Sequence, residues 1–136
     1  EALCRKLGIC KDIRFMGKQQ AVEDLLNISD LFIIPSQNES FGLSALEAMA
    51  CEVPVISSNA GGLPEVNIQG KTGYLADVGD IDTMAEKALE ILTNEELHEK
   101  LKKGAYEVAQ QFHINEILPQ YEELYSRIYD KVNKED

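Results

Sequence analysis

Strand-like and helical patterns alternate over the first half of the chain. Apolar runs that end at Gly, Pro or polar residues predict strands at 13–16, 31–34, 54–57 and 74–76. Apolar residues at helical spacing predict helices at 22–28 and 42–50. Run 31–34 is apolar throughout and stops at Pro35, which is typical of a strand buried on both faces. Strands that alternate with helices predict an α/β fold, in which helices cover a parallel sheet.

The pattern becomes helical after Gly79. Asp80 is predicted to cap the first of these helices, because a carboxylate oxygen accepts from a free N–H of the first turn. Thr93, with Glu96 three residues later, has the spacing of a capping box, so a second helix is expected to begin there. Gly104 is expected to weaken that helix, since glycine is a poor helix former.

The final segment has the most regular helical period of the chain, with apolar side chains on one face from Ile114 to Val132. Pro119 is tolerated only in the first turn of a helix, so a start at about Asn115 is expected. No linker, repeat or low-complexity run divides the chain. One domain is therefore predicted, with a sheet that is short for a doubly wound fold.

Composition and charge exclude several classes of function. With 136 residues, 44% of them hydrophobic, the chain can form one globular core. No apolar run approaches the roughly 20 residues of a membrane span, and the first residues lack a signal-peptide pattern. The net charge of -11 argues against nucleic acid and against an anionic membrane surface as partners. Cys4, Cys10 and Cys51 lack metal-ligand spacing, so reduced thiols in a cytoplasmic protein and no metal site are predicted.

The segment from Pro35 to Ala50 carries the clearest chemistry. It follows a predicted buried strand, and ligands of open α/β sheets bind beyond the carboxyl ends of the strands. Gly42 opens the predicted helix, whose unpaired N–H groups and partial positive charge suit a phosphate. Glycine also lets a bulky anion approach the backbone.

Glu47 lies five residues beyond Gly42, about 7.5 Å along the helix axis. A carboxylate there can accept hydrogen bonds from two hydroxyls of a ribose. Ser44 lies on the same face, whereas the other helix positions are apolar and small. The residues alone leave a second interpretation open, in which Glu39 caps the helix and Glu47 is a solvated surface residue.

Glu39 and Glu47, with seven residues between them and Phe41-Gly42 inside, resemble the signature of glycosyltransferase family 4. Blocks at 30–36, 53–56, 61–65 and 70–74 follow in that family's order and spacing. The resemblance implies a Rossmann-like sheet in a GT-B enzyme. Residues 1–136 would be a partial C-terminal domain that binds a nucleotide sugar. Its first strands and the N-terminal domain would be missing, and a final helix at about 115–132 would cross back to that domain.

The resemblance implies the activity of a retaining hexosyltransferase. Such an enzyme moves a sugar from a nucleotide donor to a hydroxyl acceptor without a metal or other cofactor. Carried over, Glu39 is the catalytic carboxylate that holds the donor sugar, and Glu47 binds the ribose. The other donor-binding residues implied by the resemblance are Phe41, Gly42, Leu43 and Ser44 at the helix start, and Gly17 and Lys18 beside the base.

Further blocks at 15–19, 46–51, 95–98 and 120–122 resemble the subgroup that joins N-acetylglucosamine to L-malate in bacillithiol biosynthesis. This implies UDP-N-acetylglucosamine as donor and L-malate as a small-molecule acceptor. Glu52 departs from the pattern, which usually has Gly there. The family's diphosphate-binding Arg and Lys have no counterpart, so the chain alone is expected to be inactive.

Other interpretations remain open at this point. One is a family-4 enzyme with a cell-surface polysaccharide or lipid acceptor. A second is a glycoside hydrolase that uses Glu39 and Glu47 as its two carboxylates. A third is a non-catalytic α/β binding module. The apolar face of the last helix needs a partner, either the missing domain or a second copy of the chain.

Overall fold

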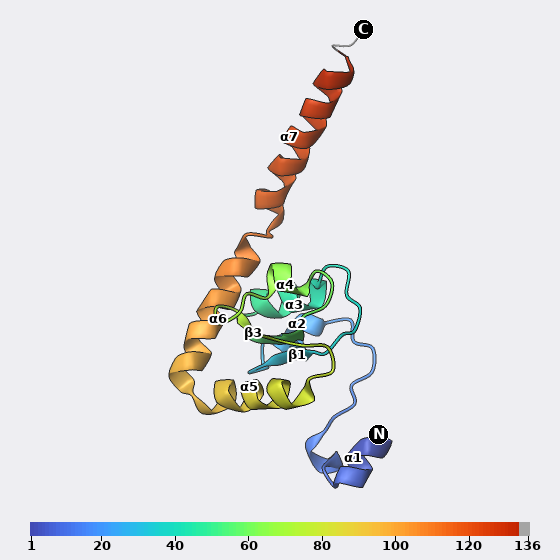
Figure 1. Cartoon of the computed structure of the whole chain (residues 1–136), viewed down its shortest axis with the longest axis vertical. Helices are drawn as coiled ribbons and strands as arrows, with labels where there is room; N and C mark the ends of the chain where they lie inside the picture. The colour runs from blue at the N-terminus through green and yellow to red at the C-terminus, as the bar shows by residue number, and fades with distance from the viewer. Residues whose placement is uncertain (134–136) are drawn as a thin grey trace.

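Three short parallel strands form the centre of the fold in this computed structural model, which describes residues 1–133 (Figure 1). The order along the sheet is β1 (Phe32–Ile34), β2 (Val55–Ser58) and β3 (Gly73–Ala76). The register places Ile33 beside Ile56, and Ile56 beside Tyr74. The predicted α/β fold with a parallel sheet is therefore confirmed.

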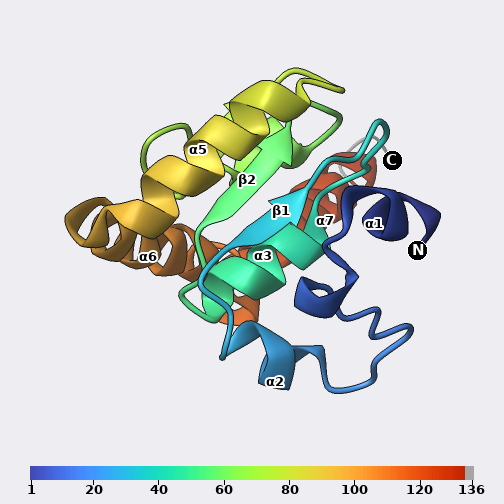
Figure 2. The same cartoon turned by 90° about the horizontal axis from the view of Figure 1, so that it is seen from below.

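Helices cover both faces of this sheet (Figure 2). The first face packs on α2 (Val22–Leu26), α3 (Leu43–Ala50), α4 (Leu63–Val66) and the end of α6 (Glu95–Gln110). The second face packs on α5 (Ile81–Thr93) and the start of α6. Neighbouring residues of β2 point in opposite directions, so Val55 enters the first core and Ile56 the second.

The edge strand β1 corrects one prediction, because it is not buried on both faces. Ile33 keeps 46% of its surface exposed, although its register partner Ile56 is fully buried. Both side chains point to the face that α5 covers, and the strands on which α5 mainly packs are β2 and β3. An apolar strand at the edge of the sheet therefore leaves one face open.

The predicted strand at 13–16 is also wrong. These residues form no strand, and Phe15 and Met16 are 59% and 49% exposed. A strand needs a neighbour to satisfy its backbone groups, and β1 pairs only with β2 among the described residues. The segment therefore runs as irregular chain before α2.

The helix caps confirm one prediction and correct another. Asp80 accepts a hydrogen bond from the N–H of Thr83 at 3.0 Å and caps α5, as predicted. The capping box at Thr93 is wrong, because its hydroxyl donates to the carbonyl of Leu89 within α5. Asn94 caps α6 instead, accepting from the N–H of Leu97 at 3.0 Å.

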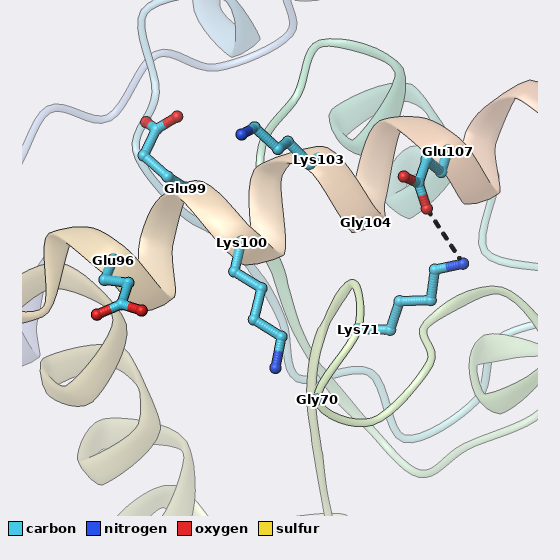
Figure 3. Close-up of a pocket in the computed structure, with 8 residues that line it drawn as sticks. All are labelled: Gly70, Lys71, Glu96, Glu99, Lys100, Lys103, Gly104 and Glu107. Carbon is cyan, nitrogen blue, oxygen red and sulfur yellow. Dashed lines mark ion pairs between the residues drawn. The ribbon is translucent and has the colours of Figure 1, made fainter.

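Gly104, which is expected to weaken α6, is a place of close packing (Figure 3). A Cβ atom at Gly104 would lie 2.1 Å from the carbonyl oxygen of Lys71, in the turn before β3. The Lys71 ammonium forms an ion pair of 3.4 Å with Glu107, one helical turn further along α6. The missing side chain lets the helix lie directly on this turn.

The last helix, α7 (Ile114–Val132), extends away from the sheet and its covering helices (Figure 1). No side chain of α7 is buried, so its apolar face is open. The helix begins at Ile114, and the ring of His113 accepts from the N–H of Asn115 at 3.2 Å. Pro119 therefore lies inside the helix and not in its first turn, which corrects the prediction.

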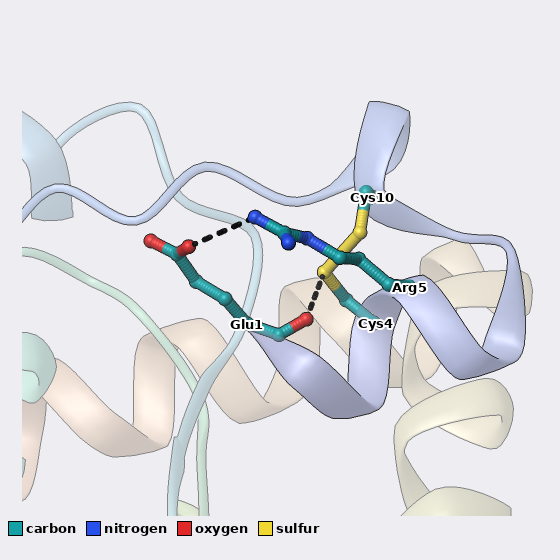
Figure 4. Close-up of a disulfide and its surroundings, with 4 residues drawn as sticks. All are labelled: Glu1, Cys4, Arg5 and Cys10. Carbon is teal, nitrogen blue, oxygen red and sulfur yellow. Dashed lines mark hydrogen bonds and ion pairs between the residues drawn. A yellow bond between two sulfur atoms is a disulfide. The ribbon is translucent and has the colours of Figure 1, made fainter.

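The N-terminal segment corrects the prediction of three reduced thiols (Figure 4). Cys4 in α1 (Ala2–Leu7) forms a disulfide with Cys10, which opens the short 3-10 helix η1 (Cys10–Asp12). Gly8 adopts φ 73 and turns the chain back, so the two Cα atoms lie 5.0 Å apart. Cys51 is the free thiol.

Candidate functional site

The loop between β1 and α3 lies beyond the carboxyl end of β1, as the sequence predicts. Gly42 precedes α3 with φ 90, and its carbonyl oxygen accepts from the N–H groups of Ala45 and Leu46. Within residues 1–133, the N–H groups of residues 41–44 donate no hydrogen bond. Four adjacent free donors at a helix N-terminus form a binding place for an anion.

Glu39 lies in this loop with a half-buried side chain. Its Oε1 accepts a hydrogen bond from the N–H of Ser40 at 3.1 Å. No side chain accepts from the first turn of α3, so Glu39 is not the helix cap. Its carboxylate keeps further lone pairs for hydroxyl groups of a ligand.

Glu47 lies in α3 with its side chain exposed, and Ser44 is half-buried. The opposite face of the helix is buried at Ala45, Ala48 and Met49. Among the described residues, Glu47 makes no ion pair. Its carboxylate is therefore accessible, on the helix whose start carries the free N–H groups.

Cys51, the free thiol, directly follows α3 in the chain. Burial raises the pKa of its thiol, and the negative charges of Glu23 and Glu47 raise it further. A thiol with a raised pKa is mostly protonated at neutral pH, so Cys51 is a poor nucleophile.

The structure brings most, but not all, of the predicted site residues together. Glu39, Glu47 and the helix-start residues Phe41, Gly42, Leu43 and Ser44 form one continuous loop and helix. Gly17 and Lys18 lie in the exposed coil before α2, and no hydrogen bond or ion pair joins them to this loop among the described residues. Their role beside the base stays a prediction.

Three contacts that support the loop were not found from the sequence. The Ser58 hydroxyl, at the end of β2, donates to the carbonyl oxygen of Ser36. Gly61 and Gly62 press their backbones against residues 39–41. The double glycine and the small residues that end β2 are the signals in the sequence, since both permit close approach of another backbone.

A buried polar network fixes the strands beneath the loop. The amide nitrogen of Asn67 donates to Ser57 Oγ at 2.9 Å and to the carbonyl oxygen of Tyr74 at 3.0 Å. Thr72 Oγ1 donates to Asn67 Oδ1 at 2.7 Å. All three polar side chains of this network are fully buried, and paired polar groups in a core hold one arrangement.

An apolar hollow of about 870 Å³ lies beside the helix start. The rings of Phe41 and Phe112 meet edge to face there, with centroids 5.9 Å apart. The hollow is lined by α3 and α7 through Leu43, Leu46, Ile117, Tyr121 and Leu124. A hollow of about 590 Å³ on α6, drawn in Figure 3, has lysines and glutamates in equal number and no convergent set of donors.

Residues 1–133 contain no group of three or more His, Cys, Asp or Glu side chains that could hold a metal ion. None of the helices described here combines the length and the apolar character that a membrane crossing requires.

The sequence profile of the family described as "Glycosyl transferases group 1" matches residues 1–108. The chain belongs to this family of glycosyltransferases. Membership in glycosyltransferase family 4 and the fold, as the C-terminal part of a GT-B enzyme, are thereby confirmed.

Individual relatives agree with the family. N-acetyl-alpha-D-glucosaminyl L-malate synthase of Bacillus anthracis is 47% identical over 124 residues, which are 90% of this chain and 32% of that protein. HepE from Anabaena in complex with UDP superposes with a TM-score of 0.88 at 26% identity, covering 93% of this chain and 35% of that one. Sucrose-phosphate synthase from Thermosynechococcus elongatus gives 0.87 at 29% identity, covering 96% and 33%. The chain therefore spans about a third of these relatives.

Proposed function

We propose that this glycosyltransferase chain binds the nucleotide-sugar donor of a retaining hexosyltransferase. The observation that carries the proposal is the row of free N–H groups at residues 41–44, between the carboxylates of Glu39 and Glu47. A diphosphate accepts hydrogen bonds from such a row, and a carboxylate accepts from sugar hydroxyls. This arrangement offers N–H donors to the diphosphate and a carboxylate acceptor to each of the two sugars.

The same residues would act during transfer. As the bond between sugar and nucleotide breaks, negative charge grows on the diphosphate. The fixed N–H groups and the dipole of α3 stabilise that charge. Glu39 holds the donor sugar through its hydroxyls, and Glu47 holds the ribose. The acceptor hydroxyl oxygen bonds to the anomeric carbon from the face that the diphosphate leaves, and its proton passes to the departing diphosphate oxygen. The anomeric configuration is thereby retained, and the proposed step uses no metal ion.

For the substrates, we propose UDP-N-acetylglucosamine as donor and L-malate as acceptor. The 47% identity to the Bacillus anthracis enzyme supports both, and the HepE complex with UDP supports the base. The shared part also occurs in a sucrose-phosphate synthase, whose product differs. Selection of the acceptor is therefore assigned to the two thirds of the relatives that this chain does not cover.

For the domain organisation, residues 1–136 are a partial C-terminal domain, and the helix near 115–132 crosses back to an N-terminal domain. The exposed apolar face of α7 supports this arrangement. A glycoside hydrolase would have no use for four free N–H groups at a helix start. A bare binding module would fit the site but not the membership in a transferase family.

The test uses the natural-length protein that carries this chain, mixed with UDP-N-acetylglucosamine with and without L-malate. We expect UDP release that depends on malate and is lost in Glu39→Ala. Release with another hydroxyl acceptor instead would keep the transferase and reject malate. No release and no UDP binding would reject the proposed function.

A further inference from the structure

We propose that Gly61 and Gly62 are positioning residues that set the place of loop 39–42, and with it the carboxylate of Glu39 and the row of free N–H groups. The inference rests on the proposed function, because it concerns the same site. It assigns a role to a turn that lies outside the loop, about twenty residues further along the chain.

The turn meets the loop backbone against backbone. A Cβ atom at Gly61 would lie 1.6 Å from the carbonyl oxygen of Glu39, and φ at Gly61 is +53. A Cβ atom at Gly62 would lie 2.7 Å from the carbonyl oxygen of Ser40 and 2.9 Å from Cα of Phe41. The N–H of Gly62 donates to the carbonyl oxygen of Glu39 at 3.4 Å. No side chain intervenes to absorb a change.

The contact continues to the start of α3. A Cβ atom at Gly42 would lie 3.0 Å from Leu63 Cδ2 and 3.3 Å from Val66 Cγ2, both in α4. Leu63 and Val66 are fully buried, and Asn67, next in the chain, belongs to the buried polar network. Because a packed interior does not compress, added volume in the turn must displace the loop and not α4.

Displacement of the loop affects one part of the site and not the other. Hydrogen bonds weaken steeply when donors move out of line, so the N–H groups of residues 41–44 would hold a diphosphate less well. Glu47 lies beyond the first turn of α3, whereas the atoms nearest to a Cβ at Gly61 or Gly62 belong to residues 39–41. A change at Gly61 or Gly62 should therefore weaken phosphate binding and leave ribose binding intact, and this pattern would identify the positioning role.

The test is Gly62→Ala in the natural-length protein. Gly62 has φ -82 and ψ -3, which alanine adopts without strain, so the substitution changes the contact alone. We expect affinity for UDP to fall by roughly tenfold or more, with a lower kcat, because a small misplacement of catalytic groups is costly. Binding of uridine, which lacks the phosphates, should be unchanged.

The matched control is Gly104→Ala, which also places a Cβ against a backbone carbonyl, at 2.1 Å from Lys71, but on α6. It should lower Tm while UDP affinity stays within about twofold, because the contact that it disturbs lies in the turn before β3 and not in loop 39–42. Should Gly62→Ala not fold, Val66→Ala removes support beneath Gly42 without adding volume, and the same loss of UDP over uridine is expected.

A fall in Tm with unchanged UDP affinity and kcat would overturn the positioning role, as would an equal loss of UDP and uridine binding. If the unaltered protein binds neither UDP nor a UDP-sugar, the proposed function itself fails. The two failures are thus distinguished by the behaviour of the unaltered protein.

Discussion

Ser58 donates its hydroxyl hydrogen to the carbonyl oxygen of Ser36, joining the last residue of β2 to the loop that leads to the proposed donor site. The Ser58 side chain is fully buried. The bond spans 22 positions of sequence, so it fixes the loop from a neighbouring strand and not from within.

We expect Ser58→Ala to lower the free energy of unfolding by about 1 kcal/mol, the usual net value of one hydrogen bond, and to raise KM for the donor. Urea unfolding and donor titration check the two effects. Ser29→Ala is the matched control, because its hydroxyl donates to Leu25 on the exposed surface of α2. Equal effects of both substitutions on KM would contradict the role of Ser58.

We expect Glu47→Ala to weaken donor binding by about 1.5–3 kcal/mol, because it removes a charged acceptor for the ribose hydroxyls. Glu47 is exposed and forms no ion pair within the described residues, so the fold should be unaffected. Calorimetric titration with UDP measures the loss. Glu96→Ala, at an exposed glutamate of α6, is the control. Unchanged affinity in Glu47→Ala would remove the ribose role.

The cap of α5 should respond to acid. Hydrogen bonds from Thr83 lower the pKa of Asp80 below its usual value. A carboxyl whose pKa is lowered by folding stabilises the folded state above its unfolded pKa, and this contribution is lost as pH falls through the folded pKa. Unfolding followed from pH 7 down to pH 2 should therefore show a smaller loss in Asp80→Asn than in the unaltered protein. Identical pH profiles would show that the charge of the Asp80 carboxylate contributes nothing to the cap.

The cysteine chemistry can be counted directly. With Cys4 and Cys10 joined, the unreduced and denatured chain should show one thiol, and the reduced chain three. In the folded protein, the raised pKa of Cys51 should keep its alkylation slow until the pH exceeds the pKa of an ordinary thiol. Cys51→Ser is the control and should show none before reduction. Three thiols without reductant would disprove the disulfide.

The sequence predicts those parts of the fold whose signals are local. Asp80 predicts the start of its helix, because the capping carboxylate and the N–H from which it accepts lie only three residues apart. The prediction of a strand at 13–16 fails because a short, mainly apolar run does not show whether another strand lies beside it. The predicted capping box at Thr93 is wrong because the Thr93 hydroxyl has a competing acceptor in the preceding turn, the carbonyl of Leu89.

The same distinction holds at the site. Glu39 and Glu47 lie on one short loop and helix, so their spacing in sequence is also their arrangement in space. The supports from Ser58 and Gly62 come from the end of β2 and from the turn before α4, and only the tertiary structure reveals them. Glu52 shows the reason for a family preference: it adopts φ 59, a conformation that favours glycine.

Gly104 carries a lesson for engineering of this scaffold. Any scheme that raises stability through helix propensity would choose this position first, since alanine gains about 1 kcal/mol over glycine in an isolated helix. Here the added methyl group would meet the Lys71 carbonyl and push α6 off the turn that precedes β3. The residue with the lowest helix propensity in α6 is thus the one that a thermostabilised variant has to keep.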